Sequence, residues 1–239
     1  MRAYADHLPE PVTIPAFGVR LPGTLTLPPD PPGVILFAHG SGSSRFSPRN
    51  QFVAAELGRA GFGTLLFDLL TEDEAASRAN VFAIPLLADR LRAAAKWVAA
   101  FPATAGLPIG YFGSSTGSAA ALVAAAGNIP PVGAVVSRGG RPDLAGDLLP
   151  RVTAPTLLIV GGADTGVLEL NAKALLQLGG VKELAVVPRA THLFEEPGAI
   201  EAVARLAAGW FLRYLIDPAI ASAGVSTVPM YGSVRQRPS

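Results

Sequence analysis

The sequence has no cysteine among its 239 residues. This absence excludes a disulfide framework, a thiolate nucleophile and a metal site with cysteine ligands. Histidine is almost as scarce: the three histidines, His7, His39 and His192, show no close pairing and no zinc-binding motif. We therefore expect no metal and no other cofactor.

Charge and long apolar runs are scarce as well. Only 15% of the residues are charged and the net charge is +1, so nothing points to a nucleic acid or an anionic membrane surface as partner. Apolar runs such as Val34–Ala38 are far shorter than a membrane span, and the first residues lack the apolar core of a signal peptide. We expect a soluble, cytoplasmic protein that is a monomer or a homodimer.

Half of the residues are hydrophobic, which suits a compact, well-buried fold. Six apolar runs of strand length alternate with helical patterns. This alternation predicts an α/β fold, with a mostly parallel sheet and helices on both of its faces. The six runs are Val34–His39, Thr64–Leu70, Leu107–Gly113, Val132–Gly140, Pro155–Gly162 and Glu183–Pro188.

The two ends of the chain differ from this pattern. Residues 12–29 predict two short strands around a turn rich in glycine and proline, at an antiparallel edge of the sheet. The last amphipathic helix is expected at Ala199–Leu215, with Glu195 and Glu196 placing negative charge near its start. We expect one domain over residues 1–216, followed by a tail, residues 217–239, that is disordered or lies on the surface.

The segment Gly113-Ser114-Ser115-Thr116-Gly117 follows an apolar strand and opens an alanine-rich helix. This is the context of a nucleophile elbow, a sharp turn that projects a serine hydroxyl at a helix N-terminus. Glycines at both ends leave room for the crowded backbone, and the helix dipole favours developing negative charge. The alternative is a tight strand-to-helix turn in which small residues serve packing alone.

A nucleophilic serine needs a base and an orienting carboxylate. His192 follows the sixth apolar run and Asp164 follows the fifth, so both are expected at the sheet edge that carries Ser115. Each has a simpler alternative: His192 as a surface-loop histidine, and Asp164 as the cap of the next helix. The chain order Ser115, Asp164, His192 is the nucleophile–acid–base order of α/β-hydrolases.

These motifs make the chain resemble an α/β-hydrolase of the dienelactone-hydrolase-like family over roughly residues 10–215. The resemblance rests on the elbow, HGSGSSR (39–45), VGGADTGVLEL (160–170) and ATHLFEEPG (190–198). It implies about eight strands and hydrolysis of a small carboxylic ester or lactone through an acyl-enzyme. Relatives of this type also occur fused to a phosphoribosyltransferase domain. Dienelactone hydrolase proper has a cysteine where this chain has Ser115, which favours ordinary serine-esterase chemistry.

The resemblance also implies an oxyanion hole made of two backbone N–H groups. One is that of Thr116, directly after the nucleophile, and the other is that of Ser41, with Gly42 as the alternative. Arg45 and Arg138 are candidates to hold a substrate carboxylate, unless they pair with the acidic residues Asp68, Glu72 or Asp143. Candidates to line an acyl pocket, unless they pack in the core, are Phe46, Leu69, Leu70, Phe82 and Phe194.

Other interpretations stay open at this point. The loop Gly40–Arg45 comes close to a dinucleotide-binding fingerprint, but Arg45 stands where the third glycine is needed. The same triad serves acyltransferases and phosphotriester hydrolases, and a related fold without catalysis serves as a binding module. The segment Thr71–Ala83 is long enough only for a small cap, which predicts small or short-acyl substrates.

Overall fold

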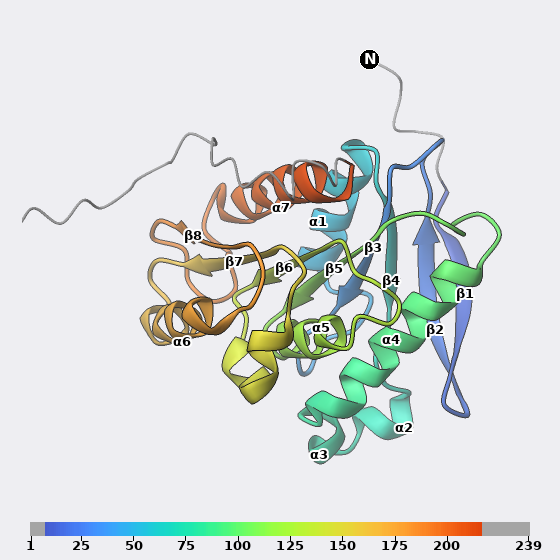
Figure 1. Ribbon diagram of the computed structural model, residues 1–239, viewed down its shortest axis with the longest axis horizontal. Coiled ribbons are helices and arrows are strands. Elements are labelled where there is room, and N and C mark those ends of the chain that lie inside the picture. Colours follow the sequence, from blue (N-terminus) through green and yellow to red (C-terminus); the bar gives the residue numbers. More distant parts are fainter. Residues whose placement is uncertain (1–7, 217–239) are drawn as a thin grey trace, which may run out of the picture.

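The computed structural model describes residues 8–216 and contains one eight-stranded sheet flanked by helices (Figure 1). The strand order is β1-β2-β4-β3-β5-β6-β7-β8. All pairs from β4 to β8 in this order are parallel, while β1 pairs with β2, and β2 with β4, in the antiparallel sense. The strands are β1 (Glu10–Ala16), β2 (Val19–Thr26), β3 (Val34–Ala38), β4 (Gly63–Phe67), β5 (Ile109–Ser114), β6 (Ala134–Arg138), β7 (Thr156–Gly161) and β8 (Lys182–Val187).

The predicted fold class and the antiparallel N-terminal edge are confirmed. Strands β3 to β7 are buried along their whole length, as their continuous apolar sequences require in a sheet covered on both faces. The sixth apolar run forms β8, which, unlike the strands of the other five runs, is largely exposed or half-buried. The reason is its position: among the described residues, β8 is the last strand of the sheet and pairs only with β7.

Helices cover the two faces of the sheet in two separate groups (Figure 1). Helices α1 (Pro48–Arg59) and α7 (Ala199–Leu215) pack on one face, around Phe37, Phe112 and Phe211. Helices α4 (Ile84–Ala100), α5 (Thr116–Ala126) and α6 (Thr165–Gln177) cover the other. Helix α1 begins at Pro48, and the hydroxyl of the N-cap residue Ser47 accepts the Asn50 N–H at 3.4 Å.

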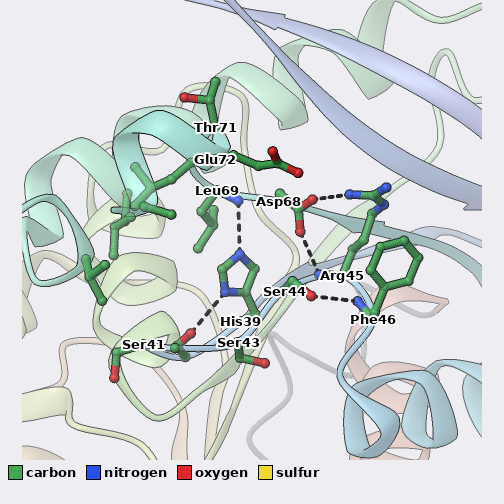
Figure 2. Close-up of a pocket in the computed structure, with 16 residues that line it drawn as sticks. His39, Ser41, Ser43, Ser44, Arg45, Phe46, Asp68, Leu69, Thr71 and Glu72 are labelled. Atoms are coloured by element: carbon green, nitrogen blue, oxygen red, sulfur yellow. Dashed lines mark hydrogen bonds and ion pairs between the residues drawn. The ribbon is translucent and has the colours of Figure 1, made fainter. Parts of the chain in front are cut away.

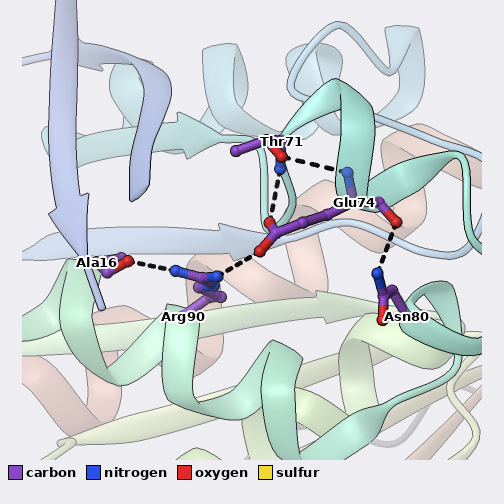
Figure 3. A network of polar contacts seen from close by, with 5 residues as sticks. All are labelled: Ala16, Thr71, Glu74, Asn80 and Arg90. Carbon is purple, nitrogen blue, oxygen red and sulfur yellow. Dashed lines mark hydrogen bonds and ion pairs between the residues drawn. The ribbon is translucent and has the colours of Figure 1, made fainter. Parts of the chain in front are cut away.

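A small cap of two short helices, α2 (Glu72–Ala75) and α3 (Arg78–Val81), lies between β4 and α4. Figure 3 shows how the buried guanidinium of Arg90 on α4 anchors it: Arg90 donates to the carbonyl of Ala16 and to the Glu74 carboxylate. Glu74 also accepts the Thr71 N–H at 3.0 Å, and the Thr71 hydroxyl accepts the Glu74 N–H at 3.2 Å. This capping box fixes the start of α2 against the body of the protein.

Two further features complete the described part of the chain. The polar segment after β6 forms 3₁₀ turns over Pro142–Arg151. Within residues 8–216, no helix is long and apolar enough to cross a membrane. His7 and the tail from residue 217 lie outside the described residues.

Candidate active site

Ser115 occupies a strained turn between β5 and α5. Its φ of 52° and ψ of −122° lie outside the regions that side-chain-bearing residues normally adopt. The flanking glycines are needed because there is no room for side chains. A β-carbon on Gly117 would lie 2.2 Å from the carbonyl oxygen of Ala38, and one on Gly113 would lie 2.5 Å from the Ser118 Cα. This local geometry is that of a nucleophile elbow.

Asp164 and His192 form a direct pair at the ends of β7 and β8. Nδ1 of His192 lies 2.7 Å from Oδ2 of Asp164. Asp164 stands at the N-cap position of α6, yet its side chain makes no capping hydrogen bond. The carboxylate therefore faces the imidazole instead of the helix. With Nδ1–H donated to Asp164, Nε2 is left as the basic nitrogen.

The turn that follows β6 brings Ser115 and His192 to one rim. The Ser115 N–H donates to the carbonyl of Arg138 at 3.2 Å, and the Arg141 N–H donates to the carbonyl of Ser115 at 3.2 Å. Between them, Gly139 has a φ of +52°, and a β-carbon there would lie 3.6 Å from Cε1 of His192. One turn thus touches both the nucleophile and the base.

Contacts that the sequence did not reveal hold the loop around His192. Glu196 accepts the Thr191 N–H at 3.0 Å, and Arg49 at the start of α1 pairs with Glu195 at 3.1 Å. The two glutamates, which lie just before the start of α7, thus also stabilise the histidine loop and its contact with α1 through their carboxylates. Because Arg49 and Glu195 lie 146 residues apart, no local pattern could have indicated their pairing.

His39 fixes the loop after β3, as Figure 2 shows. Its Nδ1 lies 3.0 Å from the carbonyl oxygen of Gly40, and its Nε2 accepts the Leu69 N–H at 3.1 Å. Both bonds together require the neutral Nδ1–H tautomer. Burial lowers the pKa of His39 below its ordinary value and so favours the same state.

The loop fixed by His39 packs against the nucleophile. A β-carbon on Gly40 would lie 3.0 Å from Cβ and 3.7 Å from Oγ of Ser115. The next N–H along, that of Ser41, donates to the Thr116 hydroxyl oxygen at 2.8 Å. The amide expected to bind the oxyanion is therefore already bonded to a side chain of the elbow helix.

A cavity of about 370 Å³ extends from this loop to the cap and is shown in Figure 2. It is lined by four of the predicted substrate-binding residues: Arg45, Phe46, Leu69 and Leu70. The backbone N–H of Arg45 donates to Asp68 at 2.7 Å, and its guanidinium also pairs with that carboxylate, so the alternative of a structural ion pair holds for Arg45. The remaining lining includes Gly42, Ser43, Ser44, Thr71, Glu72, Ala75, Val81 and Leu87.

Arg138 and Phe194 lie elsewhere, in the layer between the sheet and α1. Phe194 is buried in the core, and the Arg138 guanidinium carbon lies 5.8 Å from the centre of its ring. Burial, with repulsion from Arg49, lowers the pKa of Arg138 to about 10. Neither residue lines the cavity, so the structure does not bring Arg138 together with Arg45. The reason is the strand pleat, which puts Arg138 on the same face as Ala134 and Val136.

The sequence model of the dienelactone hydrolase family matches residues 21–213. The chain belongs to the dienelactone hydrolase family. The crystal structure of a dienelactone hydrolase from Anabaena variabilis is 54% identical, has a TM-score of 0.85 and matches over 87% of this chain and 98% of that one. Est1E from Butyrivibrio proteoclasticus, solved with ferulic acid, is 17% identical with a TM-score of 0.73, over 86% of this chain and 100% of that one; it supports the fold alone.

Curated relatives of this dienelactone hydrolase family member are longer proteins. Two strains of Mycobacterium tuberculosis have a protein named "Putative phosphoribosyl transferase" that is 60% identical over 209 residues. The match covers 87% of this chain and 47% of each relative, so the chain spans about half of their length.

Proposed function

We propose that the protein hydrolyses small carboxylic esters or lactones, with Ser115 as nucleophile, His192 as base and Asp164 as the orienting carboxylate. The observation that carries this proposal is the 2.7 Å contact of His192 Nδ1 with Asp164 at the rim that also holds the strained Ser115. A carboxylate in this position fixes the tautomer of the imidazole and stabilises the imidazolium that forms. Membership of the dienelactone hydrolase family supports the same reaction class.

The reaction would run in two steps. Oγ of Ser115 attacks the ester carbonyl while Nε2 of His192 takes its proton; the alcohol then leaves with that proton, and an acyl-enzyme remains. Water, deprotonated by His192, attacks the acyl carbon and releases the acid. The N–H of Thr116 belongs to the first turn of α5, where no intrahelical acceptor exists, so it is free to bind the oxyanion.

The cavity beside the loop of His39 supports small substrates. Its volume of about 370 Å³ is near the low end of the range of roughly 300–1,000 Å³ that is usual for ligand sites. The side chains of Leu69, Leu70 and Leu87 give it an apolar wall that suits a short acyl chain. A strong preference for long-chain lipids would contradict this part of the proposal.

The test compares p-nitrophenyl acetate and butyrate hydrolysis by the wild type and by Ser115→Ala. The matched control is Ser114→Ala, since Ser114 is the adjacent serine and is buried on the sheet side of α1. We expect Ser115→Ala to lose turnover and labelling by a fluorophosphonate, and Ser114→Ala to keep both. Equal, trivial rates in the wild type and Ser115→Ala would refute the proposal.

A further inference from the structure

The hydroxyl of Thr116 lies in the wall beside the nucleophile. Thr116 directly follows Ser115 in the chain, and only 3% of its surface is exposed. Its oxygen accepts the Ser41 N–H at 2.8 Å. The residue before Ser41 is Gly40, where a β-carbon would lie only 3.7 Å from Oγ of Ser115. This hydroxyl therefore joins the two segments between which an oxyanion would form.

The direction of the hydrogen bond leaves the Thr116 hydroxyl with a proton to donate. A hydroxyl has one donor and two acceptor sites, and here an acceptor site is used by Ser41. Among the hydrogen bonds found within residues 8–216, none is donated by this hydroxyl. A buried donor of this kind gains most from an acceptor that appears only during the reaction.

We propose that the Thr116 hydroxyl is the second donor of the oxyanion hole, next to the N–H of the same residue. The Ser41 N–H then acts through it, as a positioning group that fixes the hydroxyl oxygen. This inference rests on the proposed esterase function and replaces the direct role expected for the Ser41 amide.

Two physical arguments favour the hydroxyl over the Ser41 amide. To bind the oxyanion, the amide would have to break its 2.8 Å bond and turn the backbone of its loop, whereas the hydroxyl needs only to rotate its proton. In addition, a hydroxyl that accepts a hydrogen bond is polarised and becomes a better donor. Donors held in place before the reaction cost no reorganisation when the charge develops.

The test uses Thr116→Val, which removes the hydroxyl with little change of shape, and Thr116→Ser, which keeps it. Loss of one oxyanion donor lowers kcat by about 10²- to 10³-fold, so we expect a fall of about 100-fold for p-nitrophenyl butyrate in Thr116→Val. KM should change little, and Thr116→Ser should keep most of kcat. An alkylboronic acid, whose tetrahedral adduct with Ser115 mimics the oxyanion, should bind Thr116→Val more weakly by a factor similar to the loss in kcat/KM.

Thr156→Val is the matched control. Thr156 is also buried, but it lies at the start of β7, the end away from Asp164, and its hydroxyl donates to the carbonyl of Ala154 at 2.9 Å. Thr156→Val should lower the melting temperature without changing kcat. A wild-type kcat in Thr116→Val would overturn the inference, because the freed Ser41 amide or that of Gly42 would then be the donor. Unchanged boronate affinity despite a lower kcat would overturn it too, since that result indicates a structural role.

The failure of this inference can be told apart from the failure of the proposed function. A wild type that neither hydrolyses the esters nor reacts with a fluorophosphonate would refute the function, and the inference with it. A reactive wild type with an equally reactive Thr116→Val would refute the inference alone.

Discussion

The Cα of Gly117 packs so closely on Ala38 that a β-carbon would lie 2.2 Å from the Ala38 carbonyl oxygen. This contact ties the elbow helix to the end of β3, the strand that leads into the loop of His39. The alanine-rich sequence of α5 does not reveal that position 117 has no room for a β-carbon, because every residue of that helix is buried.

We predict that Gly117→Ala is severely destabilising. The added β-carbon would clash with the backbone of Ala38. The two backbone segments cannot move apart without displacing the elbow, so overpacking should cost about 3 kcal/mol or more. Urea unfolding monitored by circular dichroism gives the value. The control is Gly166→Ala in α6, where a β-carbon meets nothing within 4 Å; it should be neutral or stabilise by about 0.5–1 kcal/mol. Equal stability of both variants would contradict the packing argument.

Asp164→Asn should leave the fold intact and lower kcat by about 10⁴-fold. The amide cannot hold the imidazole with Nδ1 protonated and Nε2 basic, because its NH₂ group would donate to Nδ1 instead. Stopped-flow measurement of p-nitrophenol release would separate acylation from deacylation. Asp143→Asn serves as control, since Asp143 pairs with Arg141 at 2.7 Å and not with His192. Retention of activity in Asp164→Asn would exclude Asp164 from the triad.

The parts of the site that follow strand ends were predictable from the sequence. In a parallel sheet, the carboxyl ends of the strands share one edge, so Ser115, Asp164 and His192 had to lie on the same side. The glycines around Ser115 and the cap of α1 at Ser47 are local signals that need no tertiary information. The exposure of β8 could not be read from its apolar sequence, because edge position depends on the whole strand order.

The parts that depend on long-range side-chain contacts were not predictable. Ser41 and Thr116 lie 75 residues apart, and nothing in either segment indicates that an amide of one would bond the hydroxyl of the other. Arg138 was expected on the rim because it ends a strand. The alternation of β6 would have placed it correctly, since Val136 and Arg138 must share a face.

The protein should lose stability as the pH falls below about 6.5, the ordinary pKa of histidine, and His39 should contribute to this loss. Because its pKa is lowered in the folded state, the unfolded chain binds a proton in this range that the folded chain does not. Stability therefore rises with pH across the interval between the two pKa values, by at most about 1.4 kcal/mol per pH unit. Urea unfolding of the wild type and His39→Gln at pH 5 to 8 tests this, and parallel curves would contradict it.

Glu74→Gln should loosen the cap. It leaves the Arg90 side chain, only 4% exposed, without its carboxylate partner, which should cost about 2–3 kcal/mol. Asp89→Asn on α4, the helix that carries Arg90, breaks the more exposed pair with Arg92 and should cost about 0–1 kcal/mol. Because Thr71, Glu72 and Val81 of the cap segment line the cavity, we also expect a higher KM in Glu74→Gln. Equal stability losses in the two variants would mean that the cap has no special anchor.

The charges that line the cavity predict a preference for neutral acyl groups. Arg45 is neutralised by Asp68, and within residues 8–216 the Glu72 carboxylate has no ion-pair partner, so a substrate carboxylate meets net negative charge. We expect p-nitrophenyl hexanoate to be hydrolysed faster than mono-p-nitrophenyl adipate. Glu72→Gln should raise kcat/KM for the adipate alone by about 2–5-fold, the effect of one exposed charge. Glu183→Gln, at the opposite end of the sheet, should change neither substrate. A wild type that prefers the adipate would show instead that a cation of the site is free to bind the substrate carboxylate.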